Sequence, residues 1–171
     1  IQAIAGLTGV AGRLERVGEV HGGLVVVDYA HKPNALAAVL ATLRGYATGR
    51  LICVFGCGGD RDAGKRPLMG AVAQQQADQV LVTSDNPRSE DPAAILHQIL
   101  QGTIAGGTVR AEPDRAAAIA QAIAEAAPAD VVLIAGKGHE DTQETAGVRV
   151  PFSDMAHAQA ALQARGARTW A

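Results

Sequence analysis

The stretch DVVLIA, residues 130–135, decides the fold class of this chain. Its apolar side chains run without the polar alternation that marks a strand with one face in water, so they predict a strand buried on both faces. Runs of the same kind occur at residues 24–27, 51–55 and 79–83. Segments of helical composition separate and follow these runs, at residues 33–43, 66–77, 93–100, 114–126 and 153–164.

Strands that alternate with helices in this way build a mostly parallel sheet with helices on both faces. With a further short strand at residues 108–111, we expect an α/β fold with a Rossmann-like sheet of about six strands. Asp91 and Ser153 stand where N-caps of two helices would lie. Residues 1–18 are rich in glycine and are expected to be a linker or the edge of a preceding domain, with residues 19–171 forming the domain itself.

The composition excludes several classes of protein. A chain of 171 residues with 48% hydrophobic residues fits one globular domain. A net charge of −2 gives no reason to expect nucleic acid or an anionic membrane as a partner, and the apolar runs are too short to span a bilayer. Cys53 and Cys57 make no disulfide framework, and no signal peptide is visible, so we expect a cytoplasmic protein. Because the chain starts with Ile1, we expect a fragment of a longer protein.

The sequence DNPR, residues 85–88, follows the apolar run that ends near residue 83. Ligands in open α/β sheets bind where strands end. Asp85 can hold an ammonium group, Asn86 can donate and accept, and Arg88 can grip a carboxylate with a two-pronged fork. Pro87 stiffens the loop. The cluster suits a zwitterionic amino acid, although a strand-to-helix turn with a surface arginine would have the same sequence.

Polar clusters follow three other strands. DYAHKPN, residues 28–34, offers Asp28 for ribose hydroxyls and His31 or Lys32 for phosphate, and caps with a solvated histidine are the alternative. A metal site there would need more ligands than the segment provides. GCGGDRDAGKR, residues 56–66, lets the backbone approach a ligand, and GKGHED, residues 136–141, exposes backbone beside charged side chains. We expect the four clusters to converge on one crevice, with Arg61, Arg88, Asp85 and Glu140 around it.

Taken in order, these clusters resemble the C-terminal domain of the Mur ligases, in residues 28–33, 55–66, 85–88 and 135–140. The resemblance extends from about Gly12 to the end of the chain. It implies a family that joins an amino acid to the growing peptidoglycan stem peptide, using ATP and Mg²⁺ through an acyl phosphate. The nearest branch adds meso-diaminopimelate to UDP-N-acetylmuramoyl-L-alanyl-D-glutamate.

The resemblance also implies roles for single residues. The pocket for meso-diaminopimelate would comprise Arg61, Asp85, Asn86, Pro87, Arg88, Gly136 and Glu140. Arg88 would grip the distal carboxylate, which lysine lacks. The side facing ATP would comprise Arg13, Asp28, His31 and Asn34.

The family's phosphate-binding loop and Mg²⁺ ligands belong to a central domain that these residues do not contain. The resemblance therefore implies that ATP and Mg²⁺ are bound mainly by that domain, that the chain holds no metal site or catalytic residue, and that it is inactive alone. Its partners would be the substrates and the N-terminal and central domains, in a monomer. Two alternatives stay open: a stand-alone module that binds an amino acid or nucleotide, and a related ligase of the folylpolyglutamate or cyanophycin type with another acceptor.

Overall fold

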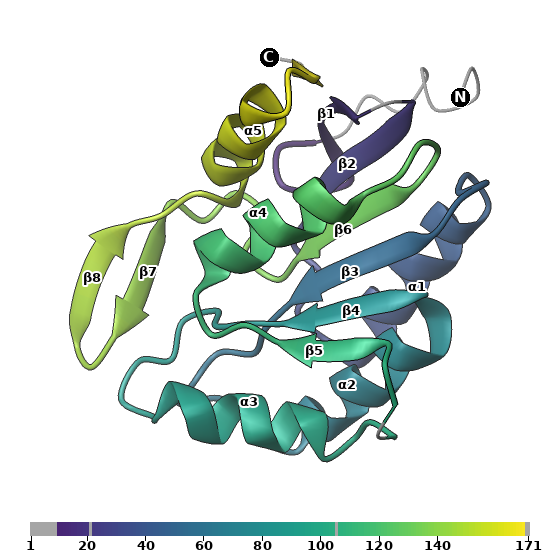
Figure 1. Cartoon of the computed structure of the whole chain (residues 1–171). Coiled ribbons are helices and arrows are strands. Elements are labelled where there is room, and N and C mark those ends of the chain that lie inside the picture. Colours follow the sequence, from purple (N-terminus) through teal and green to yellow (C-terminus); the bar gives the residue numbers. More distant parts are fainter. Residues whose placement is uncertain (1–9, 21, 105, 170–171) are drawn as a thin grey trace.

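A computed structural model describes residues 10–20, 22–104 and 106–169 of the chain. Figure 1 shows a central sheet with helices on its two faces and a small hairpin set apart from it. The sheet has the strand order β5-β4-β3-β6-β2-β1-β9. Its parallel strands are β2 (Gly23–Asp28), β3 (Leu51–Phe55), β4 (Gln79–Val82), β5 (Val109–Ala111) and β6 (Val131–Ala135). The predicted Rossmann-like, mostly parallel sheet is confirmed.

Each helix connects or follows these strands. The helices are α1 (Pro33–Arg44), α2 (Lys65–Gln76), α3 (Pro92–Leu100), α4 (Arg115–Glu125) and α5 (Asp154–Ala164). The predicted caps are confirmed, because Asp91 accepts a hydrogen bond from the Ala93 amide and Ser153 accepts one from the Ala156 amide. None of the helices in the described ranges is long and apolar enough to cross a membrane.

The buried strands explain why their sequences lack alternation. In β3, Leu51, Cys53 and Phe55 enter one hydrophobic cluster, which α1, α2 and α3 cover. Ile52 and Val54 enter a second cluster on the opposite face, which α4 and α5 cover. Because both faces are packed, every position of the strand is apolar. β6 lies between β2 and β3, and the chain leaves β3 and β6 toward opposite edges of the sheet, so the carboxyl ends of these strands border a crevice.

Four strands were not expected from the sequence. β1 (Glu15–Val20) pairs antiparallel with β2, and β9 (Arg168–Thr169) pairs with β1. β7 (Thr142–Thr145) and β8 (Val148–Pro151) form a separate hairpin. The hairpin was missed because its residues are mostly exposed and carry no buried apolar pattern.

The expected boundary between linker and domain is therefore wrong for residues 15–18. They belong to β1 and are hydrogen-bonded into the sheet. The segment just before β1 also packs on the domain, because a β-carbon added to Gly12 would lie 2.4 Å from the His139 amide nitrogen. Gly138 has a φ of +54°, and a β-carbon there would lie 2.9 Å from the Gly12 carbonyl oxygen. Residues 1–9 of the expected linker lie outside the described residues.

Candidate functional site

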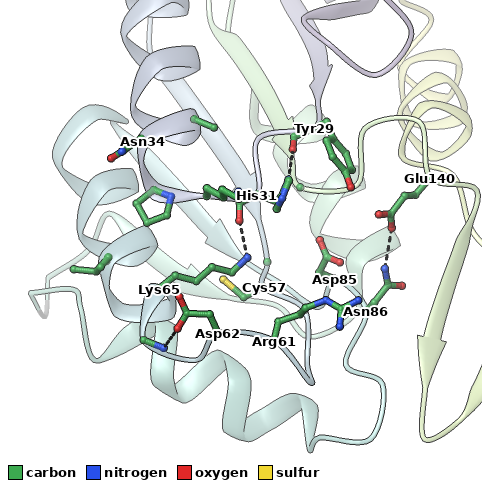
Figure 2. Close-up of a pocket in the computed structure, with 18 of the residues that line it drawn as sticks. Tyr29, His31, Asn34, Cys57, Arg61, Asp62, Lys65, Asp85, Asn86 and Glu140 are labelled. Atoms are coloured by element: carbon green, nitrogen blue, oxygen red, sulfur yellow. Dashed lines mark hydrogen bonds between the residues drawn. The ribbon is translucent and has the colours of Figure 1, made fainter.

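A cavity of about 1020 Å³ opens at the carboxyl ends of β2, β3, β4 and β6 (Figure 2). The residues predicted to bind an amino acid and found in its lining are Arg61, Asp85, Asn86, Arg88, Gly136 and Glu140. The predicted convergence of the four clusters on one crevice is thus confirmed. Pro87 is buried behind the lining and accepts a hydrogen bond from the Glu90 amide at 3.1 Å.

The Asp85 carboxylate is the most enclosed acid of the cavity. The residue is 8% exposed, and no described residue donates a hydrogen bond to its carboxylate oxygens. Burial raises the pKa of Asp85, and the positive charges of Arg115 and Lys137 oppose that rise. Gly136 leaves room for the carboxylate, because a β-carbon there would lie 2.7 Å from Asp85 Oδ2, and its φ of +118° is one that side chains avoid. Asp85 is therefore a free acceptor for a cationic ligand.

Asn86 lies at the centre of a hydrogen-bonded network. Its Nδ2 donates to Glu140 Oε2 at 2.8 Å (Figure 2). Its Oδ1 accepts from Lys137 Nζ and from the Glu144 amide, each at 3.1 Å. Glu140 Oε2 also accepts from Lys137 Nζ at 3.2 Å, whereas Glu140 Oε1 accepts from no described residue. The network fixes one edge of the Glu140 carboxylate and leaves the other edge available to a ligand.

Arg88 is positioned by two neighbouring loops. Its guanidinium donates to the Gly59 carbonyl at 2.7 Å, and its backbone has a φ of +53°. The Arg88 amide donates to the Glu144 carbonyl at 2.9 Å, and the Arg88 carbonyl accepts from the Ala146 amide at 2.6 Å. The β7–β8 hairpin therefore holds the arginine in a left-handed conformation that is costly for a residue with a side chain. No pattern in the sequence predicts this support.

The hairpin also contacts the residue that begins this loop. Gln143 Nε2 donates to the Asp85 carbonyl at 2.8 Å. Together with the contact from the Glu144 amide to Asn86, this bond joins β7 to the loop of residues 85–88 along its length. The hairpin thus serves as the outer support of the site.

Arg61 is exposed, and its guanidinium points into the cavity toward Asp85 and Asn86 (Figure 2). Its guanidinium donates to the Asp60 carbonyl at 3.1 Å, and it forms no ion pair with a described residue. Asp60 instead accepts hydrogen bonds from Ser89, which lower the pKa of Asp60. Asp62 accepts from the Gly64 amide at 2.9 Å. The Arg61 guanidinium is thus available to an anionic ligand.

Arg66 supports the glycine-rich loop of residues 56–64, a role that could not be predicted from the sequence. Arg66 is fully buried, pairs with Glu90 at 2.7 Å and donates to the Gly58 carbonyl at 3.1 Å. Its hydrogen bonds with the Glu90 carboxylate are the main reason that the pKa of Glu90 falls to about 2. Arg66 therefore helps to fix the position of the loop that carries Arg61.

A buried ion pair supports the closed end of the site. Arg115 and Asp154 are both inaccessible to solvent and lie 2.7 Å apart. Arg115 also donates to the carbonyls of Ser84 and Ala135, the residues that precede Asp85 and Gly136. Breaking such a pair by removing one partner costs about 3–5 kcal/mol, since the other charge stays buried. The sequence prediction missed this pair, because Arg115 stood at the start of an alanine-rich helix with no motif around it.

Of the residues expected to face a nucleotide, two line the cavity and two do not. His31 and Asn34 line it beside Lys65, whose ammonium donates to the His31 carbonyl at 2.7 Å. His31 Nδ1 donates to the Tyr29 carbonyl at 2.9 Å. The Tyr29 ring packs against the His31 ring with centroids 4.7 Å apart.

Arg13 and Asp28, also predicted to face ATP, are not among the residues that line the cavity. Both oxygens of Asp28 are engaged by backbone, one by the Leu14 amide and the other by the Ala30 amide, each at 2.8 Å. Arg13 is exposed beside them. In this geometry Asp28 joins the start of β1 to the end of β2, and its contact with ATP stays a prediction.

Within the described ranges, no group of three or more histidine, cysteine, aspartate or glutamate residues is arranged to hold a metal ion. Cys53 and Cys57 are free and buried, and burial raises the pKa of each thiol to about 12. The cavity's chemistry therefore rests on carboxylates, guanidinium groups and amides, which are the groups that recognise a zwitterion.

The family model described as "Mur ligase, glutamate ligase domain" matches residues 12–138. The chain belongs to this Mur ligase family. Two curated relatives named UDP-N-acetylmuramoyl-L-alanyl-D-glutamate--2,6-diaminopimelate ligase are similar over nearly the whole chain. The relative from Acidovorax sp. (strain JS42) is 68% identical over 169 residues, which are 97% of this chain. The relative from Pseudomonas aeruginosa is 57% identical over 164 residues, or 96% of this chain.

Solved structures agree with the assignment to the Mur ligase family. A structure of UDP-N-acetylmuramoyl-L-alanyl-D-glutamate--2,6-diaminopimelate ligase superposes with a TM-score of 0.87 at 44% identity, over 97% of this chain and 34% of its own. A bifunctional folylpolyglutamate synthase/dihydrofolate synthase from Yersinia pestis superposes with a TM-score of 0.62 at 23% identity, which shows the fold alone. The chain spans about a third of the length of the curated relatives that it matches, 34% for each of the two named above.

Proposed function

We propose that this chain is the amino-acid-binding, C-terminal domain of an ATP-dependent ligase. The ligase would add meso-diaminopimelate to UDP-N-acetylmuramoyl-L-alanyl-D-glutamate. The observation that carries the proposal is the arrangement of opposite charges around one cavity, with carboxylates of Asp85 and Glu140 and guanidinium groups of Arg61 and Arg88. The names of relatives with 68% and 57% identity support the same amino acid.

Diaminopimelate carries an ammonium and a carboxylate at each end, and one end would be held in the cavity. Arg88 would bind the distal carboxylate with two parallel hydrogen bonds, as a guanidinium does with carboxylates. Asp85 and the free Oε1 edge of Glu140 would accept from the distal ammonium. Arg61 is available for a carboxylate at the exposed side.

Holding the distal end would direct the other amine toward the acyl phosphate of the second substrate. That amine would attack the acyl carbon, the bond from carbon to the phosphate oxygen would break, and the amine would lose a proton. The chain's contribution is orientation of the nucleophile, which lowers the entropy that must be lost in the reaction. Selectivity would come from Arg88, because lysine has no carboxylate to fill its fork.

ATP and Mg²⁺ would be bound mainly by a central domain of the longer protein, with His31 and Asn34 on the side that faces the nucleotide. Arg13 and Asp28 belong to the same proposed side through the family resemblance. An N-terminal domain would hold the UDP part of the acceptor. We propose a monomeric enzyme in the bacterial cytoplasm.

The gene upstream of Ile1 provides a direct test. A phosphate-binding loop of the form Gly-x-x-Gly-Lys-Thr, a few hundred residues or fewer upstream, would support a ligase. The full-length product should then release phosphate only when diaminopimelate and the UDP-linked dipeptide are both present. An open reading frame without such a loop would favour a stand-alone binding module. Phosphate release with glutamate as the only effective amino acid would favour a ligase of the folylpolyglutamate type.

The 171-residue chain by itself should hydrolyse no ATP, because its described residues offer neither a phosphate-binding loop nor a metal cluster. A coupled phosphate assay on purified chain, with the full-length protein as the positive control, measures this. Phosphate release that co-purifies with the chain through successive columns would contradict the proposal that the chemistry resides in another domain.

A further inference from the structure

Lys137 is a buried cation that none of the roles above uses. Its side chain is inaccessible to solvent, although lysine is almost never fully buried unless it is paired. Its Nζ lies 3.1 Å from Asn86 Oδ1 and 3.2 Å from Glu140 Oε2. Both partners line the cavity, whereas Lys137 itself does not. The ammonium therefore touches two residues of the site from behind.

We propose that Lys137 is a positioning residue for the distal end of the amino acid. Its ammonium sets the orientation of Asn86 and Glu140 and balances the negative charge of Asp85 and Glu140 while the cavity is empty. This inference rests on the proposed function, since it concerns the same amino-acid site. Lys137 makes no contact with the ligand in this arrangement and acts through its two neighbours.

The geometry supports an orienting role, because each contact fixes one atom. Glu140 Oε2 accepts from both Lys137 Nζ and Asn86 Nδ2, so Oε1 is the oxygen left for the ligand. Asn86 Oδ1 accepts from Lys137, which requires that Nδ2 point toward Glu140. Without the ammonium, Asn86 Oδ1 would keep only the Glu144 amide as a donor, and the Glu140 carboxylate could rotate.

The charges around Asp85 support the balancing role. Arg115 on α4 and Lys137 in the loop after β6 lower the pKa of Asp85, while Glu140 in that loop and Asp154 on α5 raise it. Arg115 is already paired with Asp154 at 2.7 Å. Lys137 therefore acts on Asp85 together with Arg115 and is the buried cation in direct contact with Glu140, and its loss would favour protonation of Asp85 as the pH falls.

The test uses the full-length ligase with diaminopimelate, lysine and ATP as varied substrates. Lys137→Met should raise the KM for diaminopimelate about 10- to 100-fold, the range for losing a hydrogen bond to a charged group. The KM for ATP should stay within about twofold of the wild-type value on the same reasoning. Arg44→Met is the matched control, because it removes an exposed cation 2.7 Å from Asp78 and away from the cavity.

The pH dependence separates positioning from a purely structural role. As the solution is acidified, the KM for diaminopimelate should rise, and we call this part of the pH profile the acid limb. In Lys137→Met, the acid limb should begin at a higher pH than in the wild type. Glu140→Gln should shift this limb in the opposite direction, because it removes a charge that raises the pKa of Asp85. The double variant, which buries no unpaired charge at this point, should have its limb between those of the two single variants.

The outcomes are distinguishable. Opposite shifts of the limb in the two single variants, with an intermediate limb in the double variant, support the inference. A wild-type enzyme that prefers diaminopimelate, together with a Lys137→Met variant of unchanged KM and limb, overturns the inference alone. If Lys137→Met does not fold, the inference is decided by Glu140→Gln and the double variant, and identical limbs in those two overturn it. A wild-type enzyme with no use for diaminopimelate overturns the proposed function and this inference together.

Discussion

The cavity is lined by two sets of residues that are held in different ways. One set, which we call the closed wall, consists of Asp85, Asn86, Arg88 and Glu140, with Lys137 behind them, and its polar groups are mostly buried and joined by hydrogen bonds. The other set, the open wall, consists of Asn34, Arg61, Asp62 and Lys65, which are exposed or half-buried. Arg61, Asp62 and Lys65 each make a single hydrogen bond with the backbone.

The difference teaches where selectivity resides. Groups held in a dry network cannot adjust to a wrong ligand without leaving a charge unpaired, so they discriminate strongly. Exposed groups are screened by water and can adapt, so they contribute attraction with little discrimination. We therefore expect substitutions in the closed wall to change which amino acid is used, and those in the open wall to change how readily any amino acid binds.

The largest effect is expected from Arg88→Ala in the full-length ligase. Losing a desolvated, bidentate charge pair costs roughly 2–5 kcal/mol, or about 30-fold to several thousand-fold in binding. The KM for diaminopimelate should rise by that factor, and lysine should gain relative to diaminopimelate. Arg88→Lys should restore part of the loss, because an ammonium cannot reproduce the fork. An unchanged ratio of kcat/KM for the two amino acids would show that Arg88 does not determine which amino acid is used.

A smaller effect is expected from Gln143→Met on the hairpin. This change keeps the length of the side chain but removes the donor to the Asp85 carbonyl. A net hydrogen bond of this kind is worth about 1 kcal/mol, so the KM for diaminopimelate should rise about fivefold. Arg149→Met, which removes an exposed charge from the same hairpin, serves as its control. Equal KM values for both variants would mean that the hairpin does not support the site.

Arg61→Ala tests the open wall. An exposed guanidinium contributes about 0.2–1 kcal/mol, so the KM should rise by no more than about fivefold. Because solvent-exposed charges are screened, the difference from wild type should shrink as salt is added. The ratio of kcat/KM for diaminopimelate and lysine should stay nearly constant. A loss as large as that of Arg88→Ala, unaffected by salt, would show that the two walls do not differ in kind.

The smallest effect concerns stability without ligand. Burial raises the pKa of Asp85, so the ionised form opposes folding above the unfolded pKa. Asp85→Asn should therefore raise the Tm of the empty protein by a few degrees at neutral pH, while it abolishes binding of diaminopimelate. The gain should vanish as the pH falls to the ordinary range for aspartate, where Asp85 is protonated in both states. A lower Tm for this variant at neutral pH would contradict the cost assigned to the charge.

Glu90 should change the stability of the protein with the opposite pH dependence to that of Asp85. Its pKa is lowered to about 2, chiefly by Arg66, so its contribution to stability is complete above the unfolded pKa near 4.5. That contribution should be lost as the pH falls from about 4.5 toward about 2, and Glu90→Gln should abolish this part of the acid dependence. Thermal unfolding followed by circular dichroism across this range measures it. An acid limb that is the same in Glu90→Gln and in the wild type would exclude Glu90 as its origin.

Much of the fold and half of the site could be predicted from residue patterns. The run of residues 51–55 had to be a strand because each position is packed on one face or the other. Asp85 and Glu140 could be assigned to one crevice because each follows a parallel strand. The β7–β8 hairpin could not be predicted, because its strands bury little and their role lies in backbone bonds to Arg88. The burial of Lys137 could not be predicted either, since lysine is ordinarily exposed and its partner Asn86 is distant in sequence and in another loop.

The contact between Gly12 and the loop after β6 has a mechanical consequence. The chain enters the domain by crossing directly over the turn that carries Glu140, with only hydrogen atoms between the two backbones at Gly12 and Gly138. A displacement of the segment before β1 would therefore change its contact with His139, the residue next to Glu140. The Asp28 carboxylate accepts a hydrogen bond from the Leu14 amide, so the same segment is tied both to the end of β2 and to the loop that carries Glu140.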